Sequence, residues 1–204
     1  LMLGWNKITS IEAGSFDDLT SLKVLSLDFN RISSLPENVF EHLKELKEIS
    51  LYSNQFKSLP AQLFKNNRKL VKIDLSGNQI EEIPSNFFAG LTELEVLWLE
   101  NNKISYLPTN LFNDLTKLRE IDLERNNLKV LSKEIFEFNK KLERINLSEN
   151  QLEKIDEELF DGMENLRWVD LRNNKCIKKQ FGWWASTFNL NLWELKSEIK
   201  AKCN

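Results

Sequence analysis

The feature that most constrains this chain is a period of 24 residues that runs through most of its length. Asparagine and leucine each recur at eight successive steps of this period, and phenylalanine recurs at seven. The columns are Asn6, Asn30, Asn54, Asn78, Asn102, Asn126, Asn150 and Asn174; Leu3, Leu27, Leu51, Leu75, Leu99, Leu123, Leu147 and Leu171; and Phe16, Phe40, Phe64, Phe88, Phe112, Phe136 and Phe160. Because each unit of such a sequence buries its apolar side against its neighbours, the pattern predicts a stack of equivalent coils.

A single repeat indicates how each coil folds. In the stretch "LKVLSL", which starts at Leu22, the apolar Leu25 and Leu27 alternate with residues of the opposite face, which is the period of a β-strand. Equivalent strands 24 residues apart run in the same direction, so the predicted sheet is parallel. The phenylalanine column is expected to fill the opposite side of the stack as a continuous aromatic spine, which buries much apolar area.

The asparagine column occupies an inward-facing turn, where a polar side chain must have its hydrogen bonds satisfied. An amide both donates and accepts, so we expect each asparagine to join the loop backbones of adjacent coils. A second turn carries proline only at positions 36, 60, 84 and 108. Proline fixes φ there and ends the turn, so we expect the later coils, with Ser132 and Asp156 in this column, to be looser at that edge.

The unit "LKVLSLDFNRISSLPENVFEHLKE", residues 22–45, resembles the leucine-rich repeat L-x-x-L-x-L-x-x-N-x-L in its 24-residue extracellular form. The resemblance extends over residues 1–175. It implies an α/β solenoid, a horseshoe with a parallel β-sheet on the concave face and an irregular convex side. About eight coils, the first of them partial, are therefore expected in residues 1–175, followed by a C-terminal capping region in residues 176–204.

The period stops after residue 174, and the tail has the pattern of a helical cap. Leu192, Leu195, Ile199 and Cys203 share one face of a helix that Asn191 could cap. This face is expected to cover the open end of the last coil.

Both cysteines lie in this capping region, so Cys176 and Cys203 are predicted to form one local disulfide; two reduced, buried thiols are the alternative. Caps of the family usually carry four cysteines, and the two-cysteine form resembles that of secreted insect leucine-rich repeat proteins.

Composition and motifs exclude several classes of function. The net charge of -3, from 28 basic and 31 acidic residues, lacks the basic bias of a nucleic-acid-binding protein. No apolar run approaches the roughly 18 residues of a membrane span. His42, the only histidine, lies away from every carboxylate cluster, and no glycine-rich phosphate loop is present. We therefore expect neither an enzyme nor a cofactor.

The outward strand positions on the concave sheet are the ones a repeat protein leaves free for binding. Neighbouring strands lie about 4.8 Å apart, so these positions form one continuous surface. They include an acidic field that contains the stretch "REIDLERNN", residues 119–127, with aromatic and basic residues beside it. The candidate ligand-binding residues are Tyr52, Lys72, Trp98, Glu100, Glu120, Asp122, Glu124, Arg144 and Trp168.

Four interpretations of the acidic field differ in what they require. Catalytic carboxylate pairs need unequal environments, and a calcium ion needs six to eight oxygens around it, neither of which an open strand face offers. We therefore expect no catalytic residue and no metal ligand. A solvated strand face without function remains the strongest alternative. Tyr52, Trp98 and Trp168, expected to be exposed on the same face, favour a ligand footprint that prefers a basic partner surface.

Asn146 lies in "NLS", residues 146–148, the only Asn-x-Ser/Thr sequon. An ordinary strand ending is the slightly favoured explanation of these residues. If Asn146 points outward from the concave sheet, however, a glycan could be attached there and would block that part of the face.

The resemblance implies an extracellular binding module, either secreted or the ectodomain of a surface protein. Its partner would be a protein, glycan or microbial ligand, as in innate immunity or cell adhesion. An intracellular scaffold or inhibitor is the alternative, which free thiols would favour. The chain begins in mid-strand at "LML" and without Met, so we expect a signal peptide and an N-terminal cap to precede it.

Overall fold

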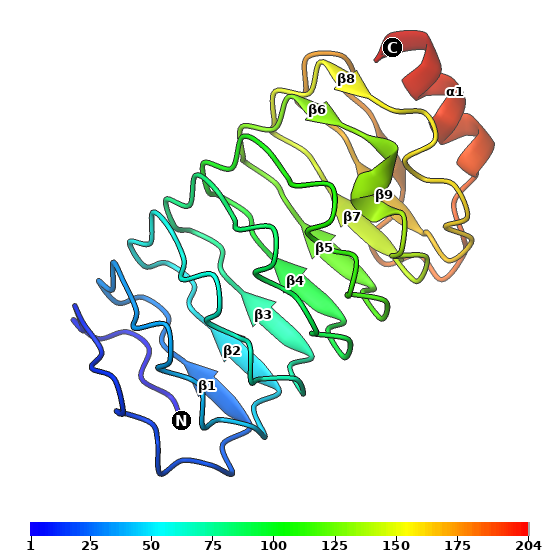
Figure 1. Cartoon of the computed structure of the whole chain (residues 1–204). Coiled ribbons are helices and arrows are strands. Elements are labelled where there is room, and N and C mark those ends of the chain that lie inside the picture. Colours follow the sequence, from blue (N-terminus) through cyan, green and yellow to red (C-terminus); the bar gives the residue numbers. More distant parts are fainter. Residues whose placement is uncertain (204) are drawn as a thin grey trace.

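The computed structural model describes residues 1–203 and shows a curved stack of coils, with the N-terminus at one end and a helix across the other (Figure 1). One strand from each coil joins an eight-stranded sheet, in which seven strands are parallel and the last is antiparallel. The strands are β1 (Val24–Ser26), β2 (Glu48–Ser50), β3 (Lys72–Asp74), β4 (Val96–Trp98), β5 (Glu120–Asp122), β7 (Arg144–Asn146), β9 (Trp168–Asp170) and β10 (Gln180–Gly182). The predicted α/β leucine-rich repeat solenoid is confirmed.

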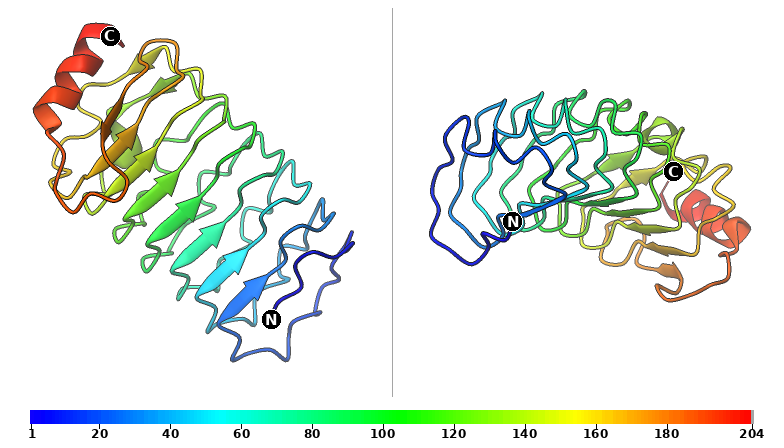
Figure 2. Two further views of the ribbon diagram at one scale, coloured as in Figure 1. Left: turned by 180° about the vertical axis from the view of Figure 1, so that it is seen from behind. Right: turned by 90° about the horizontal axis from the view of Figure 1, so that it is seen from below.

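The register of the sheet follows the sequence period directly. Asp74 of β3 lies opposite Trp98 of β4, which in turn lies opposite Asp122 of β5. An isolated bridge between Met2 and Ser26 continues the parallel pairing to the first coil. Residues 24 positions apart therefore become immediate neighbours, and the outward columns of the sequence become rows across the sheet. Figure 2 shows the strands that carry them side by side.

The core has two layers, as the periodic columns predict. The inward leucines and isoleucines of the strands are buried, with Leu25 and Leu27 fully so. The phenylalanine spine fills the other side: the ring centroids of Phe40 and Phe64 lie 6.1 Å apart in nearly parallel planes. Burial of such rings is therefore a main source of stability beside the aliphatic layer.

The inward asparagines join adjacent coils as predicted. The Nδ2 group of Asn102 donates to the carbonyls of Leu99 in its own coil and Leu75 in the preceding coil, both at 3.1 Å. Its Oδ1 accepts the backbone N–H of Ile80 at 3.0 Å. Every coil from Asn30 to Asn174 repeats this arrangement, so each amide satisfies backbone groups that would otherwise be buried without partners.

The expectation that the later coils are looser where proline is absent is wrong. A second, two-stranded parallel sheet forms there from β6 (Val130–Leu131) and β8 (Lys154–Ile155), beside the 3-10 helix η1 (Lys133–Phe136). The backbone N–H of Asp156 donates to the carbonyl of Leu131 at 2.9 Å. Proline, which has no N–H, cannot make this bond in the earlier coils, so its absence adds pairing between coils.

The C-terminal cap contains the predicted helix, α1 (Leu192–Lys202), and the Asn191 side chain accepts the backbone N–H groups of Trp193 and Glu194. Leu195 and Ile199 are fully buried against the last coil. Cys176 and Cys203 form a disulfide, with their Cα atoms 5.1 Å apart. Within residues 1–203, no helix is both long enough and apolar enough to span a membrane.

Strand β10 was not predicted, and it depends on one glycine. Gly182 has φ of +68°, and a Cβ atom at this position would lie 1.9 Å from the carbonyl oxygen of Arg167. Only glycine permits this backbone approach at the end of β10, where Gly182 lies opposite Trp168 of the antiparallel β9. The segment that follows β10 is thereby directed over the C-terminal end of the sheet.

Candidate functional site

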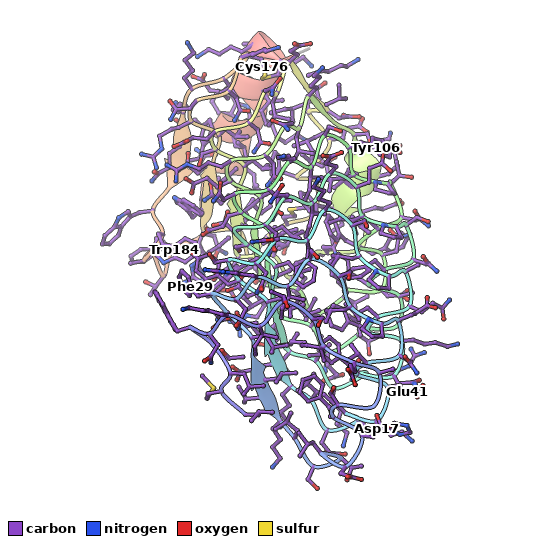
Figure 3. The ribbon with its side chains drawn as sticks, turned by 90° about the vertical axis from the view of Figure 1, so that its left-hand side faces the viewer. Asp17, Phe29, Glu41, Tyr106, Cys176 and Trp184 are labelled. Atoms are coloured by element: carbon purple, nitrogen blue, oxygen red, sulfur yellow. A yellow bond between two sulfur atoms is a disulfide. The ribbon has the colours of Figure 1, made fainter. Side chains whose placement is uncertain are left out.

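The outward residues of the sheet gather on one side of the molecule. Figure 3 shows Trp184 and Phe29 on the side that carries the sheet, whereas Tyr106, Glu41 and Asp17 lie on the opposite side. The parallel register brings the candidate residues of β3, β4 and β5 together in the middle of this face. All of the candidates except Trp168 are partly exposed there.

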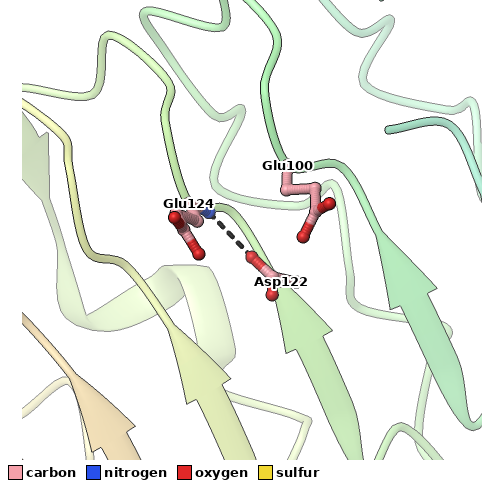
Figure 4. Close-up of side chains that lie close together, drawn as sticks. All are labelled: Glu100, Asp122 and Glu124. Carbon is pink, nitrogen blue, oxygen red and sulfur yellow. Dashed lines mark hydrogen bonds between the residues drawn. The ribbon is translucent and has the colours of Figure 1, made fainter. Parts of the chain in front are cut away.

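The predicted acidic field is present and compact. Carboxylate oxygens of Glu100, Asp122 and Glu124 all lie within 4.8 Å of one another (Figure 4). The backbone N–H of Glu124 donates to Asp122 Oδ1 at 2.9 Å. The Asn146 amide donates to Asp122 Oδ2 at 3.0 Å and to Glu124 Oε2 at 2.9 Å. Two of the three carboxylates thus already accept hydrogen bonds from Asn146.

The carboxylates differ from those of a fully solvated strand face. Burial raises the pKa of Asp122 to about 7, although the Glu124 N–H and the Asn146 amide act in the opposite direction. Burial also raises the pKa of Glu100 and of Asp74. Partial removal from water therefore makes the ionised form of this group of carboxyls unfavourable, and a positive charge placed among them would relieve that cost.

Trp98 lies at the edge of this field and is held by two charged neighbours. Its indole Nε1 donates to Glu120 Oε1 at 2.7 Å, and the ammonium of Lys72 lies 3.5 Å from the centroid of its ring. Arg144 approaches the same Glu120 carboxylate at 3.9 Å. The indole is therefore fixed in place and only half-buried, which leaves part of its surface available.

Trp168 is not exposed, contrary to the prediction from the sequence. Only 6% of it is accessible, because the ring of Trp184 packs edge-on against it at a centroid distance of 4.9 Å. Arg144 fixes this contact by donating from Nε to the Trp184 carbonyl at 3.0 Å. Trp184 is 43% exposed and replaces Trp168 on the surface. The aromatic run "FGWWASTF", residues 181–188, was the signal for this role in the sequence.

A pocket of about 330 Å3 opens between the central strands and the capping segment. It combines aromatic walls with a carboxylate-rich floor. The lining residues are Tyr52, Asp74, Ser76, Trp98, Glu100, Glu120, Asp122 and Trp184.

The expectation that Asn146 points into solvent is also wrong. Its side chain is only 6% exposed, and Oδ1 accepts both the N–H and the hydroxyl of Ser148. With Nδ2 bonded to Asp122 and Glu124, the nitrogen that a glycan would occupy is engaged inside the acidic field. A glycan at Asn146 would have to break these hydrogen bonds, so the structure favours the interpretation of the sequon as an ordinary strand ending.

The stacked coils of the structure and the repeat pattern of the sequence both indicate the same protein family. The leucine rich repeat pattern is matched in four overlapping segments, residues 1–56, 20–80, 68–128 and 116–175. The chain belongs to the leucine-rich repeat family. Members of this family are typically binding scaffolds without enzymatic activity.

Solved structures of three other leucine-rich repeat proteins are similar to this chain. TLR13, in its complex with ssRNA13, is 31% identical and has a TM-score of 0.77, covering 82% of this chain and 24% of TLR13. A Leptospira interrogans leucine-rich repeat protein is 27% identical with a TM-score of 0.78, covering 86% and 43%. Drosophila Toll in its complex with Spatzle is 25% identical with a TM-score of 0.52, covering 85% and 33%.

The leucine-rich repeat chain thus spans less than half the length of each of these proteins. No curated protein matches it in sequence.

Proposed function

We propose that this leucine-rich repeat chain is an extracellular recognition module of innate-immune type that binds a protein partner through its concave sheet. The observation that carries the proposal is the pocketed patch of aromatic and acidic side chains on β3, β4 and β5. Exposed or half-exposed aromatic residues beside charged groups are typical of interface anchors.

Two observations support the extracellular assignment. The Cys176–Cys203 disulfide fits an oxidising compartment, because reduced thiols predominate inside cells. The similarity to Toll, described in a complex that functions in Drosophila development and innate immunity, supports a role of the same kind.

The proposed footprint revises the one expected from the sequence. Its centre is Trp98, with Tyr52 and Trp184 as the other aromatic contacts. Glu100, Glu120, Asp122 and Glu124 give it a negative charge that favours a basic partner surface, while Lys72 and Arg144 hold the aromatic rings. Trp168 supports Trp184 from beneath. The capping region, described over residues 176–203, also closes the C-terminal end of the footprint.

The test uses protein partners selected from a panel of secreted proteins and ectodomains. Trp98→Ala is expected to weaken binding about 30-fold, which corresponds to roughly 2 kcal/mol for a hot-spot residue. Phe138→Ala is the matched control, since Phe138 is 50% exposed and lies outside the sheet. Surface plasmon resonance measures both. A partner that is lost with Phe138→Ala and retained with Trp98→Ala would contradict the proposal.

The acidic residues are expected to act mainly on the rate of association. Asp122→Asn should lower the association rate constant at low ionic strength, and the difference should fade as salt shortens the Debye length to about 8 Å or less. An effect of Asp122→Asn that is independent of salt would show that the carboxylate does not steer the partner.

A further inference from the structure

The pocket on the concave face has the walls of a site for an organic cation. Three aromatic residues line this space. Trp98 lies on β4, Tyr52 follows β2, and Trp184 belongs to the capping segment. Aromatic faces attract cations through their quadrupole, most strongly in tryptophan. The volume of about 330 Å3 is at the low end of the roughly 300–1,000 Å3 of small-molecule sites, so one side chain fits better than a large ligand.

Three of the four carboxyl groups that line the pocket have no ion-pair partner within residues 1–203. Within residues 1–203, no basic side chain forms an ion pair with Asp74, Glu100 or Asp122, whereas Glu120 has Arg144 nearby. Ser76 lines the same pocket, is 2% exposed, and its hydroxyl has no hydrogen-bond partner. The buried hydroxyl and the partly buried carboxylates can both accept hydrogen bonds, and a positively charged N–H donor in the pocket would supply them.

The chain already places its own cations on two of these aromatic walls. The Lys72 ammonium lies 3.5 Å from the ring centroid of Trp98, and the guanidinium carbon of Arg144 lies 5.2 Å from that of Trp184. Both kinds of basic side chain are therefore accommodated by these rings in this structure. Neither residue lines the pocket itself, so the pocket side remains accessible.

A divalent metal ion suits the pocket less well. Calcium takes six to eight oxygen ligands, and the Asn146 amide already directs N–H groups at Asp122 and Glu124. Aromatic walls contribute nothing to a hard cation of this kind but do attract an alkylammonium or guanidinium group.

We propose that the pocket lined by Tyr52, Trp98, Trp184 and the carboxylates of Glu100 and Asp122 receives one lysine or arginine side chain projecting from a protein partner. This inference rests on the proposed function and names the group that the concave face recognises. The ammonium or guanidinium would lie over the Trp98 and Trp184 rings and donate to Asp122 and Glu100. Its aliphatic stem would contact the aromatic walls.

Nuclear magnetic resonance of the intact chain tests the pocket without a known partner. The probes are Nα-acetyl-lysine methylamide and Nα-acetyl-arginine methylamide, with Nα-acetyl-norleucine methylamide as the uncharged control. We expect saturable shifts in the indole N–H signals of Trp98 and Trp184 with the two cationic probes. The signals of Trp5 and Trp193, which are exposed elsewhere, should not move. Equal shifts with the norleucine probe, or none with the cations, would overturn the inference.

A matched pair of variants separates specific binding from bulk charge. Glu100→Gln combined with Asp122→Asn should weaken binding of the cationic probes at least tenfold. Glu82→Gln combined with Glu137→Gln removes the same charge from exposed positions outside the pocket and should leave binding unchanged. If both pairs of substitutions weaken probe binding equally, the effect comes from the net charge of the chain and the proposed site is wrong.

Two further comparisons identify the source of the cation and distinguish a failure of this inference from a failure of the proposed function. If 1,5-diaminopentane saturates the shifts at lower concentration than the capped amino acids, a free diamine rather than a protein side chain is the ligand, and the inference fails. If the probes do not bind but Trp98→Ala still abolishes binding of a selected protein partner, the inference fails while the proposed function stands.

Discussion

At the scale of single residues, the stability of the stack depends on amides that join its coils. Asn102 is 8% exposed and bonds backbone groups of both its own and the preceding coil. No other side chain replaces its combination of donor and acceptor at this position. The column is therefore structural, and the chemistry of the molecule lies on the opposite, outward side of the strands.

Replacing Asn102 with alanine should be strongly destabilising. The change leaves the Ile80 N–H buried without a partner and removes one of the two amide hydrogen bonds to the Leu75 carbonyl, which Asn78 retains, at a cost of about 1–3 kcal/mol in the free energy of unfolding. Asn66→Ala is the control, because Asn66 is exposed, and should change that free energy by about 0.5 kcal/mol or less. Chemical denaturation measures both; similar values for the two variants would contradict the role of the column.

Asp122 should make the stability of the chain depend on pH. Its pKa is about 7 in the folded chain and near 3.8 without the fold, so between these values the folded state binds the proton more tightly. Stability is therefore expected to fall as pH rises from about 4 to about 7, by at most about 1.4 kcal/mol per pH unit for this group. Glu100 and Asp74 act in the same direction, since burial raises the pKa of each.

The measurement is the free energy of unfolding at about pH 5 and about pH 8 for the wild type and Asp122→Asn. The variant should lose much of the decrease, because its amide does not titrate. Exposed carboxylates such as Glu149, whose pKa is lowered by a hydrogen bond from Arg125, act only at lower pH and do not interfere. A wild type that is more stable at about pH 8 than at about pH 5 would show that this cluster does not control the pH dependence.

At the scale of elements, the cap is attached to the last coil by a disulfide and by the packing of α1. The disulfide joins Cys176, just after the last coil, to Cys203 beyond α1, and the Cys203 carbonyl accepts the N–H of Ile155. Lys196 and Lys200 of α1 pair with Asp161 and Glu157 of the last coil, although exposed pairs of this kind add little stability. The apolar face of the helix and the disulfide therefore supply most of the attachment.

Removing both cysteines should loosen the cap. Cys176→Ala combined with Cys203→Ala opens a loop with a sequence separation of 27, worth about 3 kcal/mol in the chain-entropy model. Amide hydrogen exchange should show faster exchange across residues 192–202 than in the central coils. Unchanged exchange there, or two alkylatable thiols in the native wild type, would contradict a stabilising disulfide.

At the scale of the whole molecule, the cap limits which part of the concave face is free to bind. The turn after β10 places Trp184 over β7 and β9, where it covers Trp168 and is held by Arg144. The open part of the sheet is therefore its centre and N-terminal half. An aromatic ladder continues in that direction, with Trp5 stacked on Phe29 at 3.8 Å and Phe29 against Tyr52 at 4.9 Å. A partner that contacts the pocket could extend along this ladder.

The sequence by itself determined the repeating architecture, because a strict period of 24 residues allows only one way for every coil to bury its leucines and phenylalanines at once. The parallel sheet, the inward asparagines and the proximity of Glu100, Asp122 and Glu124 follow from that period, and the capping helix follows from its own apolar pattern. Each of these features repeats or is local, so spacing along the chain is enough to place it.

Only the tertiary structure decided how the residues after the last repeat fold back and which part of the sheet they cover. The backbone approach at Gly182, the burial of Trp168 beneath Trp184 and the pocket between them depend on how the non-repeating cap folds back onto the sheet. Asn146 also points outward by strand alternation, yet its neighbours' carboxylates bury it. The physical reason is that alternation fixes the face on which a side chain lies, whereas its exposure depends on the other segments that pack against that face.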